Sequence, residues 1–216
     1  NKKKDEKVVV FDFGGGTSSL TIFEEADLLH TTIFPDGSRH ITNDLAIALR
    51  TSIDVAETIK LEYGSTSEAE DMRRREQIDL SHLLGEENFV VPKKQLTRVI
   101  DARTHELLDM VSGELKKIAR NGMLPAGVVV SGGGANLPGF AALVKEKLGL
   151  PVRIARPVHV QGMIDTVSDP AFTVSLGLVL WGIDQEIGAS RPSGSMFSGQ
   201  GGVLQKALDW LKNFLP

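Results

Sequence analysis

The chain has 216 residues, of which 41% are hydrophobic and 24% are charged, an ordinary composition for a globular protein of one or two domains. The formal net charge of −4 gives no reason to expect nucleic acid as a partner. The sequence contains no cysteine, which excludes disulfides and thiolate metal sites and is compatible with the cytoplasm, and no apolar run reaches membrane-spanning length.

A buried-type strand near the start of the chain runs into an acid and three consecutive glycines, in the sequence VVVFDFGGGTSS. Glycines let backbone N–H groups approach an anion, and successive amides form a positive concavity that suits phosphate. A carboxylate beside phosphate is a natural partner for Mg²⁺ or its water shell, and hydroxyl groups add hydrogen-bond donors. The alternative is a glycine-rich hairpin corner. The candidate cofactor-binding residues here are Asp12, Gly14, Gly15, Gly16, Thr17 and Ser18, with Asp12 also the candidate for Mg²⁺ through water.

The turn continues into two further apolar strands, which makes it a hairpin connection and excludes a P-loop or a dinucleotide fingerprint. A helix is predicted from Thr42 to Arg50, and a second helix is predicted from Ser52 to the stop signal at Gly64. Two short strands, at residues 77–80 and 89–91, then precede a long helix that follows Pro92 and has apolar residues at helical spacing.

A second strand-to-glycine turn follows the long helix, in the sequence VVVSGGGANLPGF at residues 128–140. Two such turns suggest one nucleotide held between two loops. Further on, an apolar helix over residues 172–181 is too short to span a bilayer. The candidate cofactor-binding residues of the second turn are Gly132, Gly133, Gly134 and Asn136.

The last part of the chain differs in kind from the rest. Residues 187–202 have the Gly, Ser and Pro content of a flexible linker. Residues 203–216 form an amphipathic pattern with Trp, Phe and Leu on one side, which suits a membrane surface, although such a helix can also dock on its own domain. The predicted membrane-facing residues are Leu204, Leu208, Trp210, Leu211, Phe214 and Leu215.

DFGGGTSS resembles the second phosphate loop of the superfamily that contains actin, DnaK-type chaperones and sugar kinases, and VVVSGGGANLPGF resembles its adenosine loop. The stretches HITNDLAIALRTSIDVAETIKLEYG, from His40, and PVRIARPVHVQGMIDTVSDPAFTVSLGLVLWG, from Pro151, are similar to the FtsA family of actin-like bacterial division proteins. The resemblance implies ATP with Mg²⁺ as the cofactor. It also leads us to expect a C-terminal half that lacks the first lobe, either a fragment or a natural truncation.

The implied fold class is α/β: an actin-like (ribonuclease H-like) ATPase lobe with a mixed five-stranded sheet and an inserted smaller α+β subdomain. The resemblance implies subdomain IIA at residues 1–31 and 126–186, subdomain IIB at 32–125, a linker at 187–202 and a membrane-targeting helix at 203–216.

The resemblance also assigns residues within the insertion. Glu57 and Lys60 are three apart, so they share a helix face, which the family places against ribose and adenine; from the residues alone, an exposed ion pair is the alternative. Ser19 stands where related loops carry an acid or histidine. Together with the missing first lobe, this predicts a non-enzymatic nucleotide-binding protein with weak or absent ATP hydrolysis, and weak or absent nucleotide binding by this chain alone.

The family implies a peripheral protein on the cytoplasmic face of the membrane that self-associates into filaments and binds the C-terminal tail of FtsZ through subdomain IIB. The candidates on the long helix are Arg98, Arg103 and Glu106, although a solvated basic helix face is the alternative. Replacing Arg103 by Glu is expected to weaken tail binding without lowering the thermal midpoint. Two other functions stay open: a type IV pilus assembly adaptor of the PilM type, and a kinase or ATPase of the superfamily.

Overall fold

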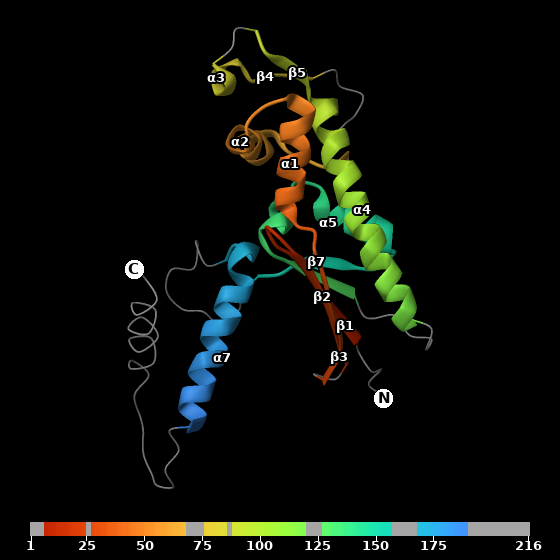
Figure 1. The fold of residues 1–216 in the computed structure, drawn as a ribbon. Helices are drawn as coiled ribbons and strands as arrows, with labels where there is room; N and C mark the ends of the chain where they lie inside the picture. Colours follow the sequence, from red (N-terminus) through yellow and green to blue (C-terminus); the bar gives the residue numbers. More distant parts are fainter. Residues whose placement is uncertain are drawn as a thin grey trace. The chain divides into compact units, whose positions relative to one another are not determined.

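The computed structural model describes residues 7–24, 27–67, 76–85, 88–119, 127–156 and 168–189 (Figure 1). The chain forms two compact units, residues 1–171 and residues 172–216. All the sheet strands lie in the first unit, and the helix α7 (Thr173–Ala189) lies in the second.

A mixed five-stranded sheet confirms the predicted fold class. Its strands are β1 (Lys7–Phe13), β2 (Ser18–Glu24), β3 (Asp27–Phe34), β6 (Gly127–Ser131) and β7 (Val152–Ile154). They lie in the order β3-β2-β1-β6-β7, with β1, β2 and β3 antiparallel and β1, β6 and β7 parallel. Because β1 and β6 are parallel, the turns that follow them lie at the same edge of the sheet.

The sheet buries one face through alternating apolar side chains, as a half-covered sheet requires. Phe11 and Phe13 of β1 are at most 1% exposed. Both rings pack against the ring of Phe140, at centroid distances of 6.3 and 4.8 Å. Phe140 begins the helix α5 (Phe140–Leu148), which contacts β7. This aromatic cluster lies directly behind the two glycine turns, so core packing fixes the turns' spacing.

An insertion between β3 and β6 supplies most of the helices. It contains α1 (Ser38–Leu49), α2 (Ile53–Tyr63), α3 (Ser81–Leu84) and α4 (Lys93–Ala119), with a two-stranded sheet of β4 (Gln77–Asp79) and β5 (Val90–Pro92). Figure 1 shows α4 running from the insertion back alongside the main sheet, and it contacts α1, β3 and α5. There are also two short 3-10 helices. One is η2 (Gly133–Asn136), which follows β6, and the other is η3 (Pro170–Phe172), which lies where the two units meet in the sequence.

The insertion contains the two predicted helices and the two predicted short strands, with strand bounds that differ by one residue, and it also contains α3, which the sequence did not predict. The helix α2 has Ser52 as its cap and ends at Gly64, as predicted. The helix α1 begins at Ser38 rather than at Thr42. Its first turn is stabilised by distant groups: the N–H groups of Ser38 and Arg39 donate to main-chain carbonyls of the first glycine turn. Partners so far along the chain cannot be predicted from the local sequence pattern, so the start of α1 was missed.

The predicted domain boundaries remain an interpretation of the sequence. The helix α7 extends to Ala189, beyond the predicted start of the linker at Ile187. The remainder of that linker and the predicted helix at residues 203–216 lie outside the described residues. Across the part of the chain that the structure describes, no helix combines the length and hydropathy needed to cross a membrane.

Candidate nucleotide-binding site

The two glycine turns lie side by side at one edge of the main sheet. In the parallel pairing of β1 with β6, Asp12 lies opposite Ser131. The hydroxyl of Ser131 donates a hydrogen bond of 2.8 Å to Oδ1 of Asp12. The end of β1 and the end of β6 are therefore joined where each strand passes into its turn.

The first turn presents free backbone donors. The N–H of Gly14 donates to the carbonyl of Thr17 at 3.1 Å, which closes the turn. Gly15, Gly16 and Thr17 are exposed, and within the described chain their N–H groups meet no acceptor. An added Cβ at Gly15 or Gly16 would meet no atom within 4 Å. These consecutive free amides have the arrangement that binds phosphate oxygen.

The helix α1 fixes the direction in which those amides point. The N–H of Ser38 donates to the carbonyl of Gly14 at 2.9 Å, and the N–H of Arg39 donates to the carbonyl of Gly15 at 2.8 Å. In a trans peptide, a carbonyl and the following N–H point in opposite directions. Because the two carbonyls point toward α1, the N–H groups of Gly15 and Gly16 point away from it.

Gly37 makes this contact between α1 and the turn possible. A Cβ on Gly37 would lie 2.6 Å from the carbonyl oxygen of Gly15 and 2.8 Å from that of Gly14. Only a glycine allows so close a backbone approach. Gly37 of the Pro-Asp-Gly sequence before α1 therefore lets the start of the helix contact the backbone of the glycine turn.

Ser18 does not face the predicted ligand. Its side chain is 1% exposed, and its hydroxyl donates to the main-chain carbonyl of Asp36 at 2.6 Å. The structure thus assigns it to holding the turn, which corrects the expectation that its hydroxyl is a phosphate donor. Thr17, by contrast, is exposed.

The glycines of the second turn serve close packing as much as ligand approach. Gly132 has φ of +84°, and a Cβ there would lie 2.4 Å from the carbonyl oxygen of Phe13. A Cβ on Gly134 would lie 2.2 Å from the ring of Phe13. Gly133 is exposed. Among these three, Gly133 alone is open to a ligand without displacing protein atoms.

Asn136 is held by an acidic side chain. Its amide donates to Oδ1 of Asp169 at 2.8 Å, and the N–H of Ala171 donates to the same oxygen at 2.8 Å. These two bonds, that of Ala171 first, lower the pKa of Asp169 below its ordinary value against a small opposing effect of burial. The amide oxygen of Asn136 remains the group that this residue can offer to a ligand.

Glu57 and Lys60 form a polar cluster between α1 and α2. The Lys60 amine donates to Oε2 of Glu57 at 2.7 Å, to the hydroxyl of Thr42 at 2.9 Å and to the carbonyl of Ser38 at 3.2 Å. The Thr42 hydroxyl also donates to Glu57. The Lys60 side chain is 9% exposed and that of Glu57 is 43% exposed, so Glu57 is the more accessible partner.

The cluster is linked to the first glycine turn, and the chain after α2 is linked to the second. Ser38, which accepts from Lys60, itself donates to Gly14. Beyond the end of α2, the N–H of Thr66 donates to the carbonyl of Pro138 at 2.9 Å, within the loop that follows η2. Lys60 is therefore linked through Ser38 to the first turn, and the contact of Glu57 and Lys60 with a nucleotide stays a prediction.

Arg103 is held by ion pairs, which bears on the expectation that its replacement leaves the thermal midpoint unchanged. Its Nε and one terminal nitrogen donate to the two oxygens of Asp44, at 2.7 and 3.1 Å. Its other terminal nitrogen lies 3.0 Å from Glu106 and 3.5 Å from Asp36. The bonds to Asp44 raise the pKa of Arg103, against the lowering effect of burial and with support from the charges of Asp36 and Glu106. Replacing it is thus expected to disturb the fold.

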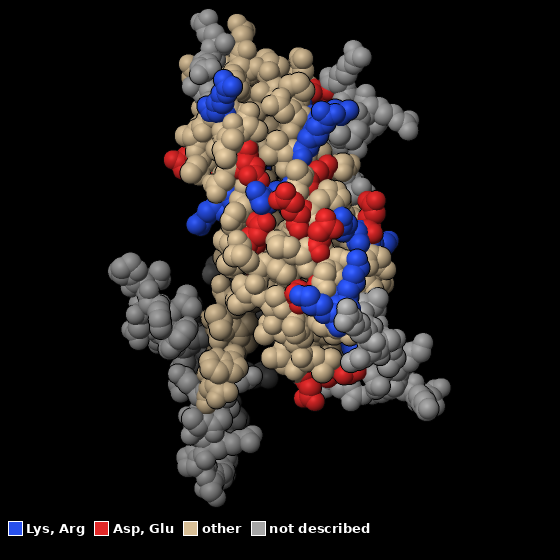
Figure 2. Space-filling model, turned by 45° about the vertical axis from the view of Figure 1, so that its right-hand side comes forward, with Lys and Arg blue, Asp and Glu red and all other residues tan. Residues whose placement is uncertain are grey.

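The other two predicted partner-binding residues are accessible. The Glu106 side chain is 65% exposed. Arg98 is exposed, and it has no hydrogen bond or ion pair within the described chain. Figure 2 shows acidic and basic side chains intermixed on this face, with no large patch of one sign.

Asp12 fits the part predicted for it beside Mg²⁺. One carboxylate oxygen is occupied by Ser131, which leaves the other available. Within the described ranges, no group of three or more His, Cys, Asp or Glu side chains could enclose a metal ion. A single carboxylate with phosphate and water as the remaining ligands is the usual environment of Mg²⁺.

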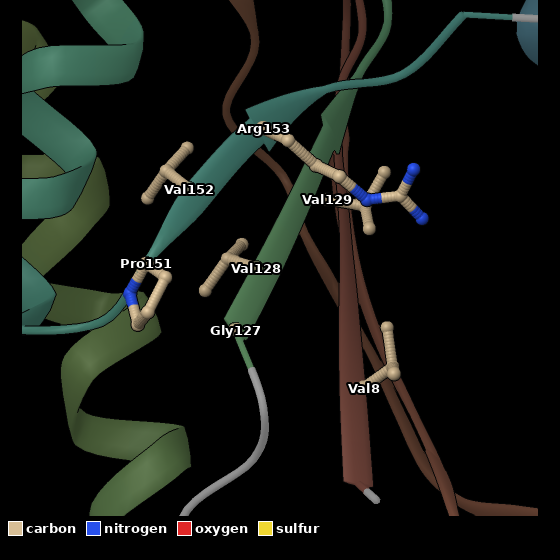
Figure 3. A pocket seen from close by; sticks show the side chains of 7 residues that line it. All are labelled: Val8, Gly127, Val128, Val129, Pro151, Val152 and Arg153. Atoms are coloured by element: carbon tan, nitrogen blue, oxygen red, sulfur yellow. The ribbon is translucent and has the colours of Figure 1, made fainter.

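A pocket among the described residues lies elsewhere and does not fit a nucleotide. It is found at the opposite ends of β1, β6 and β7 from the glycine turns and has a mostly apolar lining, and among the described residues that line it Arg153 is the one cation (Figure 3). Its lining residues are Val8, Gly127, Val128, Val129, Pro151, Val152 and Arg153.

Three supporting residues have functions that sequence reasoning missed. They are Asp36, Thr42 and Ser131, none of which is among the candidate site residues of the sequence. Their roles depend on partners far along the chain: Arg103, Glu57 and Asp12, respectively. Only the resemblance of the surrounding stretches could have drawn attention to them.

Comparison with known proteins identifies close sequence similarity to one family. A family model described as "Cell division protein FtsA" matches residues 9–177. Cell division protein FtsA of Pseudomonas aeruginosa is 32% identical over 97% of this chain and 52% of its own length. The protein of the same name from Neisseria meningitidis is 32% identical over 98% of this chain and 52% of its own length. The chain spans about half the length of these curated relatives.

Solved structures support the fold at lower identity. MreB5 of Spiroplasma citri bound to ADP superposes with a TM-score of 0.65 at 20% identity, over 87% of this chain and 56% of that one. The PilM–PilN type IV pilus biogenesis complex gives a TM-score of 0.61 at 21% identity, over 82% of this chain and 46% of that one. These likenesses confirm the actin-like fold.

The polar cluster on α2 predicts an acid-dependent contribution to stability. Burial alone would raise the pKa of Glu57, but hydrogen bonds from Lys60 and Thr42, with the charges of Lys60 and Arg39, lower it below its ordinary value. The stabilisation is therefore complete above the ordinary glutamate pKa of about 4.3 and is lost as the pH falls through the lower folded value. In urea unfolding, Glu57→Gln is expected to cost less than about 1 kcal/mol at neutral pH and to reduce the loss of stability on acidification.

Glu62→Gln is the matched control, because Glu62 is an exposed residue of the same helix. It is expected to leave the acid-dependent loss of stability as in the parent. An identical loss in Glu57→Gln and the parent would contradict the assigned role of Glu57.

Proposed function

The chain belongs to the FtsA family of cell division proteins, and from this we propose that it binds Mg²⁺-ATP between its two glycine turns and acts as a non-catalytic adaptor. The adaptor attaches FtsZ filaments to the cytoplasmic face of the membrane and self-associates into filaments. Family membership favours this function over the pilus adaptor and the superfamily kinase.

The observation that carries nucleotide binding is the pair of outward N–H groups at Gly15 and Gly16. The carbonyls of Gly14 and Gly15 are bonded to α1, so these amides are held in place before a ligand arrives. Preorganised donors bind an anion without the cost of reorganisation. Asp12, beside the turn, would hold a hydrated Mg²⁺ through its carboxylate, and the ion would supply positive charge to the phosphates. Gly133, Asn136 and Glu57 are proposed to contact the nucleoside side of the ligand.

The non-catalytic role is proposed because a serine, Ser19, follows the first turn at a position where a charged side chain could activate the attacking water. Ser19 pairs with Asp12 across β1 and β2. A serine carries no charge near neutral pH, so it neither binds a metal through charge nor acts as a general base for the attacking water. Nucleotide is therefore proposed to serve as a structural and assembly ligand.

The turn itself provides a test of nucleotide binding. We expect Gly15→Asp in the full-length protein to lower the affinity for Mg²⁺-ATP at least roughly tenfold, because a carboxylate there would face the phosphate with like charge. The thermal midpoint without nucleotide should barely change, because a Cβ at Gly15 meets no atom within 4 Å. Isothermal titration calorimetry measures the affinity.

The matched control is Gly113→Asp in α4, where a Cβ also meets no atom within 4 Å. It should bind Mg²⁺-ATP as the parent does. Unchanged affinity in Gly15→Asp would show that the phosphate does not lie on this turn.

Membrane attachment is proposed from the sequence of residues 203–216, which lie outside the described structure. Burying a large apolar side chain contributes roughly 1.5–3 kcal/mol, so partial insertion of several such side chains gives reversible binding by one copy. Several copies in one filament would bind more firmly through their effective concentration.

FtsZ binding is proposed for the exposed part of α4. A tail peptide that is both acidic and apolar would be attracted by Arg98, whose guanidinium has no partner within the described chain. Glu106 is exposed beside Arg103 and provides an acceptor for peptide N–H groups. Arg103 contributes to this surface while it remains bonded to Asp44.

One recruitment experiment separates the two adaptor functions. Vesicles of phosphatidylethanolamine and phosphatidylglycerol are sedimented with FtsZ and the full-length protein, or with variants of it. Removing residues 203–216 is expected to abolish sedimentation of both proteins with the vesicles. Arg98→Glu is expected to keep the adaptor on the vesicles and to lower FtsZ recruitment at least about tenfold, by replacing attraction with repulsion.

Lys116→Glu provides the same charge change at an exposed position near the other end of α4 and should recruit FtsZ normally. Vesicle binding that survives the truncation would contradict membrane attachment through the tail. Equal recruitment by Arg98→Glu and Lys116→Glu would remove Arg98 from the FtsZ-binding surface.

A further inference from the structure

Arg103 connects α4 to the segment that supports the first glycine turn. Its guanidinium binds both oxygens of Asp44 in α1, and its remaining terminal nitrogen lies 3.5 Å from Oδ2 of Asp36. Asp44 lies in the body of α1, whereas Asp36 lies just before it. The same terminal nitrogen also lies 3.0 Å from Glu106 of α4 itself. Arg103 therefore joins α4 to two carboxylates of the α1 region, Asp44 and Asp36, which have different structural surroundings.

Asp36 is a buried carboxylate that requires a cation. Its side chain is 9% exposed. Its Oδ1 accepts no hydrogen bond from the described residues, although it lies 3.1 Å from Nδ1 of His40. That nitrogen is also 3.1 Å from the N–H of Gly37 and accepts its hydrogen bond. With Nδ1 used as an acceptor, Arg103 is the positive group within 4 Å of Asp36 in the described chain, and an unpaired buried charge is costly.

The main chain of Asp36 contacts the turn directly. Its carbonyl accepts the buried hydroxyl of Ser18, the first residue after the turn. The next residue, Gly37, packs against the carbonyls of Gly14 and Gly15. A shift of Asp36 would therefore move both the end of the turn and the backbone on which the turn rests.

We propose that Arg103 is a positioning residue for the nucleotide: through its charge on Asp36, it holds the first glycine turn with the N–H groups of Gly15 and Gly16 directed at phosphate. This inference rests on the proposed nucleotide-binding function and extends it to a residue on α4 that does not contact the ligand. The bond to Asp44 anchors Arg103 and joins α1 to α4. The contact with Asp36 carries the effect on the turn.

The two carboxylates allow positioning to be separated from stability. In the full-length protein, Arg103→Ala is expected to lower Mg²⁺-ATP affinity about tenfold. Asp36→Asn is expected to lower it by a similar factor, and the double variant should bind no more than about twofold more weakly than the weaker single variant, because both changes break one link. Asp44→Asn is expected to lower the thermal midpoint but to change affinity less than Asp36→Asn. Calorimetry with Mg²⁺ and ATP provides the affinities.

A second readout does not require nucleotide. In the nucleotide-free protein, the ¹H–¹⁵N resonances of Gly15 and Gly16 should move in Arg103→Ala and stay in place in Arg98→Ala, the matched exposed arginine on α4. Arg103→Lys, which keeps the charge and is the variant more certain to fold, should restore the resonances and the affinity in part.

The outcomes distinguish this inference from the proposed function. If the parent does not bind Mg²⁺-ATP, the proposed function fails, and the resonances alone decide whether Arg103 positions the turn. Unmoved Gly15 and Gly16 resonances in Arg103→Ala would overturn the inference. If the parent binds ATP, two further results would overturn the inference. One is an affinity of Arg103→Ala within twofold of the parent, and the other is additive losses of affinity in the Arg103 and Asp36 double variant.

Discussion

The hydrogen bonds from the first turn of α1 to the glycine turn are the interaction on which the rest of the site depends. Ser38 and Arg39 hold the carbonyls of Gly14 and Gly15, and the geometry of the trans peptide then directs the following N–H groups outward. Without this support, three consecutive glycines would have a large conformational entropy and no fixed direction. The N–H groups at the start of α1, which have no partner within the helix, thus donate to carbonyls of the loop, and the N–H groups of the loop remain free for a ligand.

The same edge of the sheet brings the second turn into place through packing rather than through a ligand. The parallel pairing of β1 with β6 sets Ser131 beside Asp12, and Gly132 and Gly134 let the second turn close against Phe13. Glycine therefore has two separate functions in these loops: exposing amides in the first turn and allowing close contact in the second. A nucleotide between the turns would contact both loops, and the aromatic core behind the loops fixes the spacing between them.

The parts of the fold that depend on local sequence could be predicted, and the parts that depend on distant partners could not. Local glycine signals and apolar spacing predicted the end of α2 and the long helix α4, because each signal acts within a few residues. The mixed five-stranded sheet was expected from the family resemblance. The start of α1 at Ser38, the inward direction of Ser18 and the engagement of Arg103 each depend on a partner outside that range. The structure brings the two glycine turns to one edge of the sheet, and the division of their residues into exposed and supporting groups depends on partners far along the chain.

The central claim is that a phosphate of ATP rests on the outward amides of the first glycine turn. It is tested most directly by a crystal structure of the full-length protein with Mg²⁺ and a non-hydrolysable ATP analogue. We expect phosphate oxygens within hydrogen-bonding distance of the N–H groups of Gly15 and Gly16, with Asp12 on the water shell of the metal. A nucleotide bound away from this turn, with those amides still facing solvent, would contradict it.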